Sequence, residues 1–331
     1  MKRMDMNSKA QRWRFRAGLL AGLAILLGVF DLPVASGADP VPAGEGTNQI
    51  FRMAVTASMF SEVNETDARA AMKVWIMALS TERQIPVDPD PLIFRNLDEL
   101  TNACQTRSID GVGLMTSEYL RLSRTMKFDR LGVSSVEGRI GEVYVVLVRQ
   151  DSGIVRLNQL QGRTLNVLDT ARTSLATVWL DTALVEAGLN PCARWFKQIK
   201  RSSKASLVTL PVFFHQADAC LTTSNSFKVM GELNPQVASQ LRALATSPEL
   251  MPVFFAFREH ERSPLSPQIF EAMEGMHETS AGKQILTLVK ADRIVAEPVS
   301  CLNSSLELLA RHERLCGEEN PADRSPNEPG R

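Results

Sequence analysis

The chain has 331 residues, and its 37 Lys and Arg residues balance 37 Asp and Glu residues, so its formal net charge is zero. This length suits two domains of about 150 residues each. The balanced charge gives no support to nucleic acid or an anionic membrane surface as a partner, so any attraction for an anion must be local.

The N-terminus has the order of charge and hydropathy that is typical of an export signal. Basic residues dominate up to Arg16, an apolar run covers 17–30, and the small residues Ala35-Ser36-Gly37 follow. This pattern predicts a secretory signal peptide that is cleaved near Gly37, and therefore a periplasmic mature protein. The alternative is an uncleaved anchor, although the run is shorter than the roughly 20 residues that span a bilayer.

Alternating strands and helices are predicted along the mature chain. Strands are expected at 50–56, 92–94 and 110–115, with helices at 68–79, 97–107 and after Thr116-Ser117. A strongly β-prone strand at 142–149 leads to a second series, with strands at 164–168, 195–199 and 218–222 and helices at 174–188, 203–210 and 224–231. Strands at 241–245 and 253–257 and helices at 266–278, 280–290 and 304–314 complete the pattern. Such alternation predicts parallel strands joined by right-handed crossovers.

The order of elements predicts an α/β fold with two lobes, each a mainly parallel sheet flanked by helices. The expected division is a signal peptide at 1–37, a linker at 38–49, a first lobe at 50–147, a second lobe at 148–250, a return to the first lobe at 251–316 and a disordered tail at 317–331. Hinge closure is expected near 148–150 and 250–253. Ligands of open parallel sheets lie beyond the carboxyl ends of the strands, so a cleft between the lobes is the expected site.

Hydroxyl-bearing residues follow the ends of several predicted strands. Thr173 and Ser174 open the helix after the strand at 164–168. Free backbone N–H groups and the positive end of the helix dipole suit an anion there, and Arg172 would add a charge-assisted bond. Further predicted donors follow the first and third strands: Thr56, Ser58, Thr116 and Ser117.

Signatures of enzymes and of metal sites are missing from the sequence. It has no GxSxG elbow, no Walker loop and no GxGxxG, and none of its four histidines stands at a metal-ligand spacing. We therefore predict a binding protein rather than an enzyme, with no metal and no cofactor.

The five cysteines leave two alternatives. Export permits disulfides, and an odd number leaves at least one thiol without a partner. Cys192 and Cys220 are the preferred pair, and Cys301 with Cys316 is a second one. In the other alternative, all five thiols are reduced and buried as small apolar groups.

In the order and spacing of several segments, the sequence resembles the phosphate/phosphite/phosphonate-binding proteins of ABC importers, a branch of the type 2 periplasmic binding proteins. The matching segments are 64–67, 109–113 with Tyr119, 144–153, 160–169, Thr173-Ser174, 216–219 and 241–248, which together span most of 50–290. The resemblance implies that Arg172, Thr173 and Ser174 hold a small oxyanion. Leu175 replaces the family's glycine, and a side chain there restricts the approach of an anion to the backbone.

The resemblance also implies further ligand residues and partners. Family members that bind aminoalkyl phosphonates use tyrosines and a carboxylate. Tyr119 is one of two tyrosines in this chain, and Asp218 falls at the family's Gln/Gly-x-Asp-Ala position. The expected function is therefore an exported, monomeric solute-binding protein that serves the membrane permease of an ABC importer. The alternative is a periplasmic sensory or accessory protein on the same scaffold, which reports to a membrane partner such as a histidine kinase.

Overall fold

The structure is a computed structural model that describes residues 50–106, 109–259 and 263–317. The chain divides into residues 1–47 and residues 48–331, and all that follows concerns the second unit. The predicted signal peptide and linker lie outside the described residues, as does the tail beyond residue 317. Within the described ranges, no helix is both long enough and apolar enough to cross a membrane.

The first sheet has six strands. Their order is β11 (Arg293–Pro298), β4 (Phe128–Ser135), β10 (Val253–Arg258), β3 (Gly111–Met115), β1 (Met53–Thr56) and β2 (Leu92–Phe94). Strands β2, β1 and β3 run parallel, whereas β10, β4 and β11 join by antiparallel pairing. β1 and β3 are almost wholly buried, as strands covered on both faces should be.

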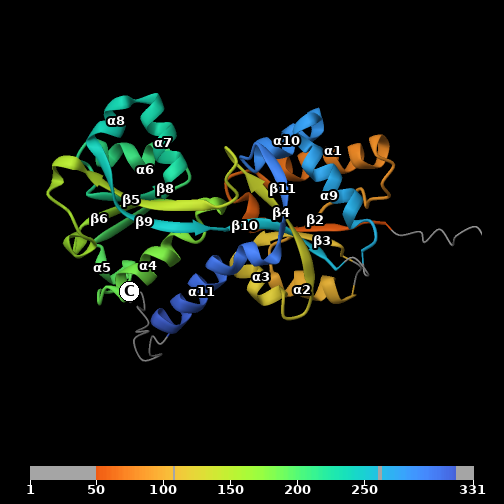
Figure 1. Cartoon of the computed structure of the whole chain (residues 1–331), viewed down its shortest axis with the longest axis horizontal. Coiled ribbons are helices and arrows are strands. Elements are labelled where there is room, and N and C mark those ends of the chain that lie inside the picture. The colour runs from red at the N-terminus through yellow and green to blue at the C-terminus, as the bar shows by residue number, and fades with distance from the viewer. Residues whose placement is uncertain (1–49, 107–108, 260–262, 318–331) are drawn as a thin grey trace, which may run out of the picture. The chain divides into compact units, whose positions relative to one another are not determined.

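Helices cover both faces of this sheet (Figure 1). On one face lie α1 (Glu65–Glu82), α9 (Ser266–Glu274) and α10 (Ser280–Leu288), which pack Trp75, Phe270 and Ile285 into a core with Phe255. On the other face lie α2 (Leu97–Thr106) and α3 (Thr116–Leu122), whose Leu100 and Leu122 join a second core.

The second sheet has five strands. Their order is β7 (Gln198–Ser202), β6 (Thr164–Leu168), β8 (Ala219–Thr223), β5 (Glu142–Arg149) and β9 (Leu241–Leu250). Strands β7, β6 and β8 are parallel, and β5 pairs antiparallel with both β8 and β9. The carboxyl ends of the three parallel strands therefore share one edge of the sheet.

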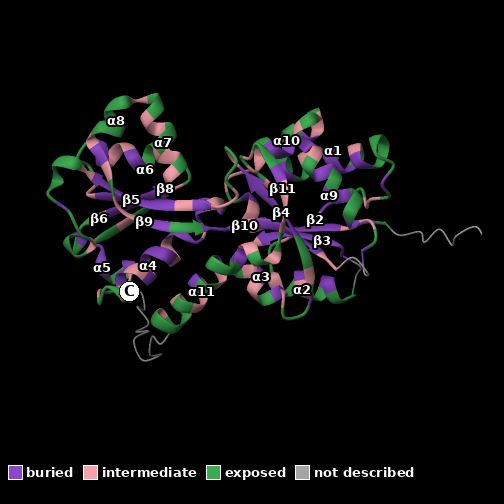
Figure 2. Cartoon of the chain, viewed as in Figure 1, coloured by how far each residue is buried: buried purple, intermediate pink, exposed green. Residues whose placement is uncertain are grey.

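Both faces of the second sheet are also covered. One face carries α4 (Ala176–Glu186), α5 (Cys192–Trp195) and α11 (Asn303–Cys316), the other α6 (Ala205–Phe213), α7 (Ser224–Leu233) and α8 (Pro235–Gln240). Figure 2 shows that buried residues concentrate along the strands of both sheets and on the helix sides that face them. The C-terminal α11 adds Leu308 to the core beneath α4.

The α/β class with two helix-flanked sheets is confirmed, with two corrections to its details. First, the sheets are mixed rather than mainly parallel. In the first sheet β10, β4 and β11 join by antiparallel pairing, and the sequence pattern did not reveal β4 and β11. In the second sheet β5 pairs antiparallel with β8 and β9. Second, β5 pairs with β8 and β9 along its length, so residues 142–147 belong to the second sheet. The first passage of the chain between the sheets is thus at 136–141 rather than at 148–150, while the second, at 251–252, lies within the expected 250–253.

The predicted disulfides are absent. Cys192 and Cys220 are both free, buried thiols. Cys192 belongs to the core beneath α4, whereas Cys220 belongs to the core beneath α6, so the sheet stands between the two side chains. Cys301 is also a free thiol, so the second pairing with Cys316 is not formed either. Burial raises the pKa of the Cys220 thiol to about 12.

A glycine fixes the start of α10, the helix that leads to a cationic residue of the site described below. A Cβ on Gly282 would lie 2.2 Å from the carbonyl oxygen of Met276, which is backbone and cannot rotate away. We predict that Gly282→Ala lowers the free energy of unfolding by about 1–3 kcal/mol through overpacking, measured by urea denaturation. Lys283→Ala, at an exposed neighbouring position, should change it by less than about 0.5 kcal/mol. Equal stability of the two variants would contradict the close approach.

Candidate functional site

A cavity of about 180 Å³ lies at the carboxyl ends of the parallel strands in the second sheet. Leu168 ends β6, Thr223 ends β8 and Ser203 follows β7 directly, and all three line it. We call it the hydroxyl cavity, after the hydroxyl groups of Thr170, Ser203, Thr223 and Ser226. Asn225 and three charged residues complete its polar lining; the charged residues are Glu142, Arg172 and Lys290.

The hydroxyl groups lie here because β8 passes into α7 without an intervening loop. Thr223 is the N-cap of α7, where its Oγ1 accepts the N–H of Ser226 at 3.0 Å and donates to Ser226 Oγ at 2.9 Å. Ser203 and Asn225 are exposed, and within the described residues their side chains have no hydrogen-bond partner. Both are therefore available to donate to a ligand in the cavity.

An ion pair between Arg172 and Glu142 forms one wall of the hydroxyl cavity. Arg172 Nε donates to Glu142 Oε1, and the two side chains are only 18% and 7% exposed. Arg172 Nη1 also approaches the carbonyl oxygens of Val289 and Lys290 at 3.5 and 3.4 Å. The Tyr144 hydroxyl donates to the carbonyl oxygen of Arg172 at 3.0 Å, so this arginine is held at both its backbone and its side chain. Burial raises the pKa of Glu142, and the charge of Arg172 opposes that rise without cancelling it.

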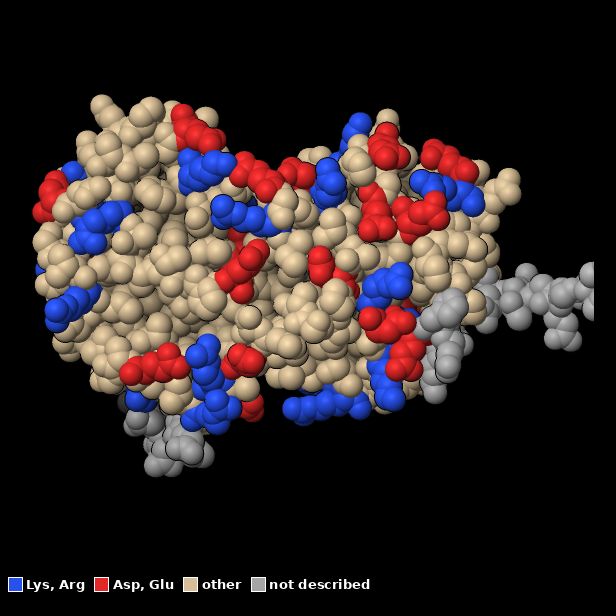
Figure 3. Space-filling model, in the orientation of Figure 1, with Lys and Arg blue, Asp and Glu red and all other residues tan. Residues whose placement is uncertain are grey.

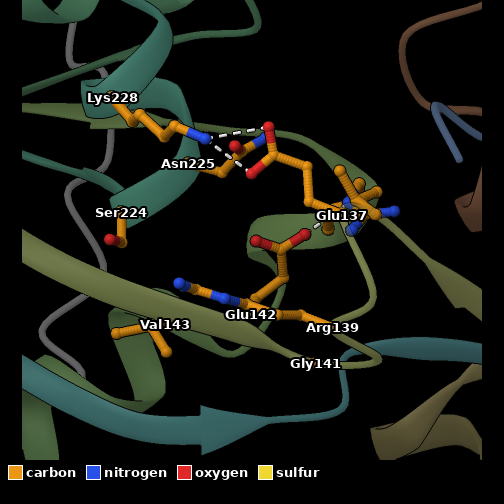
Figure 4. Close-up of a pocket in the computed structure, with 10 residues that line it drawn as sticks. Glu137, Arg139, Gly141, Glu142, Val143, Ser224, Asn225 and Lys228 are labelled. Carbon is orange, nitrogen blue, oxygen red and sulfur yellow. Dashed lines mark hydrogen bonds and ion pairs between the residues drawn. The ribbon is translucent and has the colours of Figure 1, made fainter. Parts of the chain in front are cut away.

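A second cavity shares Glu142 and Arg172 with the first (Figure 4). Lys228 spans part of it and donates to both carboxylate oxygens of Glu137, at 2.9 and 2.6 Å. Glu142 directs its other carboxylate oxygen into the space, and that oxygen has no hydrogen-bond partner among the described residues. We call this the ion-pair cavity, defined by Glu137, Glu142, Lys228 and Ser224.

Three of the cations that line these cavities are paired with carboxylates, and Arg139 is a further cation in the lining of the ion-pair cavity. Arg172 pairs with Glu142, Lys228 with Glu137, and Lys290 with Glu62. Figure 3 shows acidic and basic side chains interspersed over the face that it draws. A ligand would therefore be selected by short-range hydrogen bonds rather than by a broad positive field.

The predicted donors after β1 already have an internal partner. Thr56 and Ser58 donate to the two carboxylate oxygens of Glu118, at 2.8 and 2.7 Å. The N–H of Met115 donates to the same carboxylate at 2.8 Å. A carboxylate of the chain itself therefore accepts from both hydroxyls, and neither residue lines the hydroxyl cavity, so their role as ligand donors stays a prediction from the sequence.

The other predicted ligand residues near the first sheet are Thr116, Ser117 and Tyr119, and they lie away from the hydroxyl cavity. Thr116 donates its hydroxyl to the carbonyl of Met251, and Ser117 is exposed. Tyr119 is buried, with its ring 5.6 Å from that of Phe128 and 5.5 Å from that of Phe254 between centroids. None of these predicted residues lines the cavities that contain Arg172.

In the second sheet, the turn after β6 lies beside the hydroxyl cavity, and of its predicted ligand residues only Arg172 lines the cavity. Thr173 closes a local cap, since its hydroxyl donates to Leu168 O at 2.7 Å and accepts the N–H of Thr170 at 2.9 Å. The Ser174 hydroxyl is buried and has no partner in the described structure. Leu175 is 1% exposed and packs in the core beneath α4, so it does not line the cavity.

Asp218 lies at the opposite end of the strands from the cavity. It precedes β8, and its carboxylate accepts the N–H and the hydroxyl of Thr164, both at 2.8 Å, at the start of β6. Arg163 donates to it at 3.2 Å. These bonds tie the two strand starts together. Asp218 does not line the hydroxyl cavity, and its role as a ligand contact stays a prediction from the sequence.

Sequence reasoning missed most residues that line the hydroxyl cavity. Ser203, Thr223 and Ser226 follow β7 and β8 just as Thr173 follows β6, so the same rule, a hydroxyl after a parallel strand, would have found them. Glu142 and Lys290 gave no comparable signal, because they reach the cavity only through tertiary packing. Within the described ranges, no group of three or more His, Cys, Asp or Glu residues could hold a metal ion.

Comparisons with known proteins place this fold in a class. The family described as "ABC transporter, phosphonate, periplasmic substrate-binding protein" matches residues 57–297. A binding-protein component of an ABC phosphonate transporter from Pseudomonas aeruginosa has a TM-score of 0.54 at 13% identity, covering 82% of this chain and 90% of that one. PhnD1 from Prochlorococcus marinus, solved with methylphosphonate, has 0.53 at 12% identity, covering 80% and 98%. A Xanthomonas citri protein solved with ATP has 0.58 at 13% identity, covering 82% and 100%.

The fold is that of a type 2 periplasmic binding protein, as the sequence predicted. No curated protein sequence matches the chain. With the family matched over more than half of its length, the chain belongs to the periplasmic substrate-binding proteins of phosphonate ABC transporters. That family consists of binding proteins, which confirms the prediction that the chain is not an enzyme.

The raised pKa of Glu142 gives a testable pH dependence. Burial raises its folded-state pKa above the value of 4.5 that applies to the unfolded chain. The stability linked to this group is therefore present below pH 4.5 and is lost as the pH rises through the folded pKa. We predict that Glu142→Gln gains in Tm relative to the wild type between pH 4.5 and neutral pH.

Thermal unfolding across that range measures the difference. Glu232→Gln, which removes an exposed carboxylate on α7, is the control and should run parallel to the wild type. If the Tm difference between Glu142→Gln and the wild type does not change with pH, the assignment of a raised pKa is wrong.

Proposed function

We propose that the chain, exported and freed of its signal peptide near Gly37, captures a small oxyanion of the phosphate, phosphite or phosphonate class in the hydroxyl cavity for an ABC importer. The observation that carries the proposal is the gathering of hydroxyl groups, Arg172 and Lys290 at the carboxyl ends of three parallel strands. This is the edge at which α/β sheets bind ligands.

The lining of the cavity matches the chemistry of such a ligand. A tetrahedral oxyanion needs several donors at short range, which Ser203, Asn225 and the Thr223–Ser226 pair can supply. Arg172 keeps Nη2 for a further charge-assisted bond, while its Nε is paired with Glu142 and its Nη1 faces the carbonyl oxygens of Val289 and Lys290. Apolar Leu168 and Ala205 lie beside these donors and suit a small organic substituent on phosphorus.

Family membership supports the ligand class and the partner. Substrate-binding proteins of ABC transporters deliver a small molecule to a membrane permease, and we infer the same partner for a monomer of this chain. The N-terminal charge and hydropathy pattern supports export. A sensory protein that reports to a histidine kinase would bind its ligand in the same cavity. The cavity therefore does not distinguish the two roles, and the sensory role stays a prediction from the sequence.

Isothermal titration calorimetry with phosphate, phosphite and methylphosphonate tests the proposal. We expect saturable binding by the wild type and an affinity about tenfold weaker for Ser203→Ala, since a hydrogen bond to a charged group is worth about 1.5–3 kcal/mol. The Ser203 side chain has no other hydrogen-bond partner in the described residues, so its loss should leave Tm nearly unchanged.

The matched control is Ser239→Ala on α8, an exposed hydroxyl that donates to the carbonyl of Gln236 away from the cavity. It should bind like the wild type. Absence of heat with all three ligands would remove the oxyanion assignment, and an unchanged affinity for Ser203→Ala would remove the hydroxyl cavity as the site.

A further inference from the structure

We propose that the ligand of this chain carries a short, uncharged alkyl substituent, which enters an apolar pocket beside Arg172. The inference rests on the proposed function, because it concerns the organic part of the oxyanion that the hydroxyl cavity captures. Its basis is a third cavity, of about 30 Å³, which shares Arg172 and Lys290 with the hydroxyl cavity. We call it the apolar pocket, after the side chains that form most of its wall: Met59, Val253, Phe254, Phe255, Leu288 and Val289.

Met59 faces this pocket because of the way in which the chain leaves β1. The 3₁₀ turn Ala57–Phe60 follows β1 directly, and Ser58 within it donates to Glu118. The next side chain, that of Met59, lines the apolar pocket and is only partly buried. Gly113 on the neighbouring β3 makes room for it, since a Cβ there would lie 2.6 Å from Met59 Sδ. The end of β1 therefore presents a thioether to this pocket.

A second void lies behind the apolar pocket. It has a volume of about 20 Å³, it shares Phe255, Leu288 and Val289 with the pocket, and every described residue that lines it is apolar or aromatic. Unbranched thioether side chains adapt to irregular neighbours, so the void allows the wall of the pocket to move back from an apolar guest. Four methionines line the void: Met53, Met72, Met273 and Met276.

The charges around the apolar pocket favour an uncharged substituent over an amine. Glu62 is the only carboxylate among the described residues that line the pocket, and it is paired with Lys290. An ammonium group would lose its hydration there without gaining an unpaired carboxylate, and it would lie beside the cations Arg172 and Lys290. An alkyl group, by contrast, is stabilised by leaving water.

The size of the space limits the length of the substituent. A cavity needs roughly 10–15 Å³ to hold one water-sized group, so the apolar pocket of about 30 Å³ holds two such groups. In the hydroxyl cavity, Leu168 and Ala205 suit the first carbon on phosphorus. The apolar pocket suits the carbons beyond it, so ethyl and propyl groups are the expected substituents.

Isothermal titration calorimetry with methyl-, ethyl- and propylphosphonate tests the pocket. We expect the affinity of the wild type to rise about fourfold with each methylene, which is the fold-change that corresponds to burying one CH₂ group. The matched ligand is 2-aminoethylphosphonate, which has the same number of non-hydrogen atoms as propylphosphonate but ends in an ammonium group. It should bind at least about tenfold more weakly than propylphosphonate.

The variant Met59→Gln keeps the length of the side chain and replaces its thioether by a polar amide. We expect it to bind propylphosphonate no more tightly than methylphosphonate. Met77→Gln changes an exposed methionine on α1 outside the pocket, so it is the matched control and should keep the wild-type series. Thermal unfolding of both variants checks that they are folded.

The outcomes separate the two proposals. Equal affinity of the wild type for all four phosphonates, tighter binding of the amine than of propylphosphonate, or binding of phosphate or phosphite alone overturns the apolar pocket and leaves oxyanion capture intact. A folded Met59→Gln protein that keeps the rising series also overturns it, and the wild-type series decides if that variant does not fold. If the wild type binds none of these phosphonates, nor phosphate or phosphite, the proposed function itself fails.

Discussion

The buried pair of Arg172 and Glu142 is the interaction on which the site depends. Glu142 begins β5 directly after the chain enters the second sheet, and Arg172 follows β6, so the pair reaches past the intervening β8. The same guanidinium approaches carbonyl oxygens after α10, which belongs with the first sheet. A buried ion pair is weak evidence for stability, because desolvation offsets its attraction. The ion pair matters here because it fixes the position of the wall that the two cavities share.

Carboxylates of the chain itself pair with several of the donors and cations near the predicted and proposed sites. Glu118 takes the hydroxyls after β1, while Glu142, Glu137 and Glu62 each take a cation beside the cavities. These pairs balance charge locally, just as acidic and basic residues balance over the whole sequence. Recognition is left to the few donors without a partner in the described residues, notably Ser203 and Asn225, whose geometry can discriminate between anions of similar charge.

Local patterns were enough to predict most elements, because strand alternation and helix caps act over a few residues. They could not reveal β4 and β11, nor the direction in which β5 and β10 pair with their neighbours, because strand pairing joins distant segments. Thr56 and Ser58 were predicted as ligand donors from their place after the first strand, and no local pattern could reveal their contact with Glu118, which lies about 60 residues further along the chain. Cys192 and Cys220 were paired by proximity in sequence, which cannot show that a sheet separates them. Ser203 and Thr223 were predictable by position, whereas Glu142 was not.

The turn after β6 explains why the proposed anion site lies beside the predicted helix start rather than on it. A 3₁₀ turn at Ala171–Thr173 precedes α4, and the Thr173 hydroxyl donates locally to the carbonyl oxygen of Leu168. Leu175 then enters the core beneath α4, where an apolar side chain is favoured and a glycine would leave a void. Burial of Leu175 covers the first turn of α4, so donors open to a ligand remain at the neighbouring ends of β7 and β8. The residue that departs from the family pattern is therefore compatible with an anion site one strand away, formed by Ser203, Thr223 and Arg172.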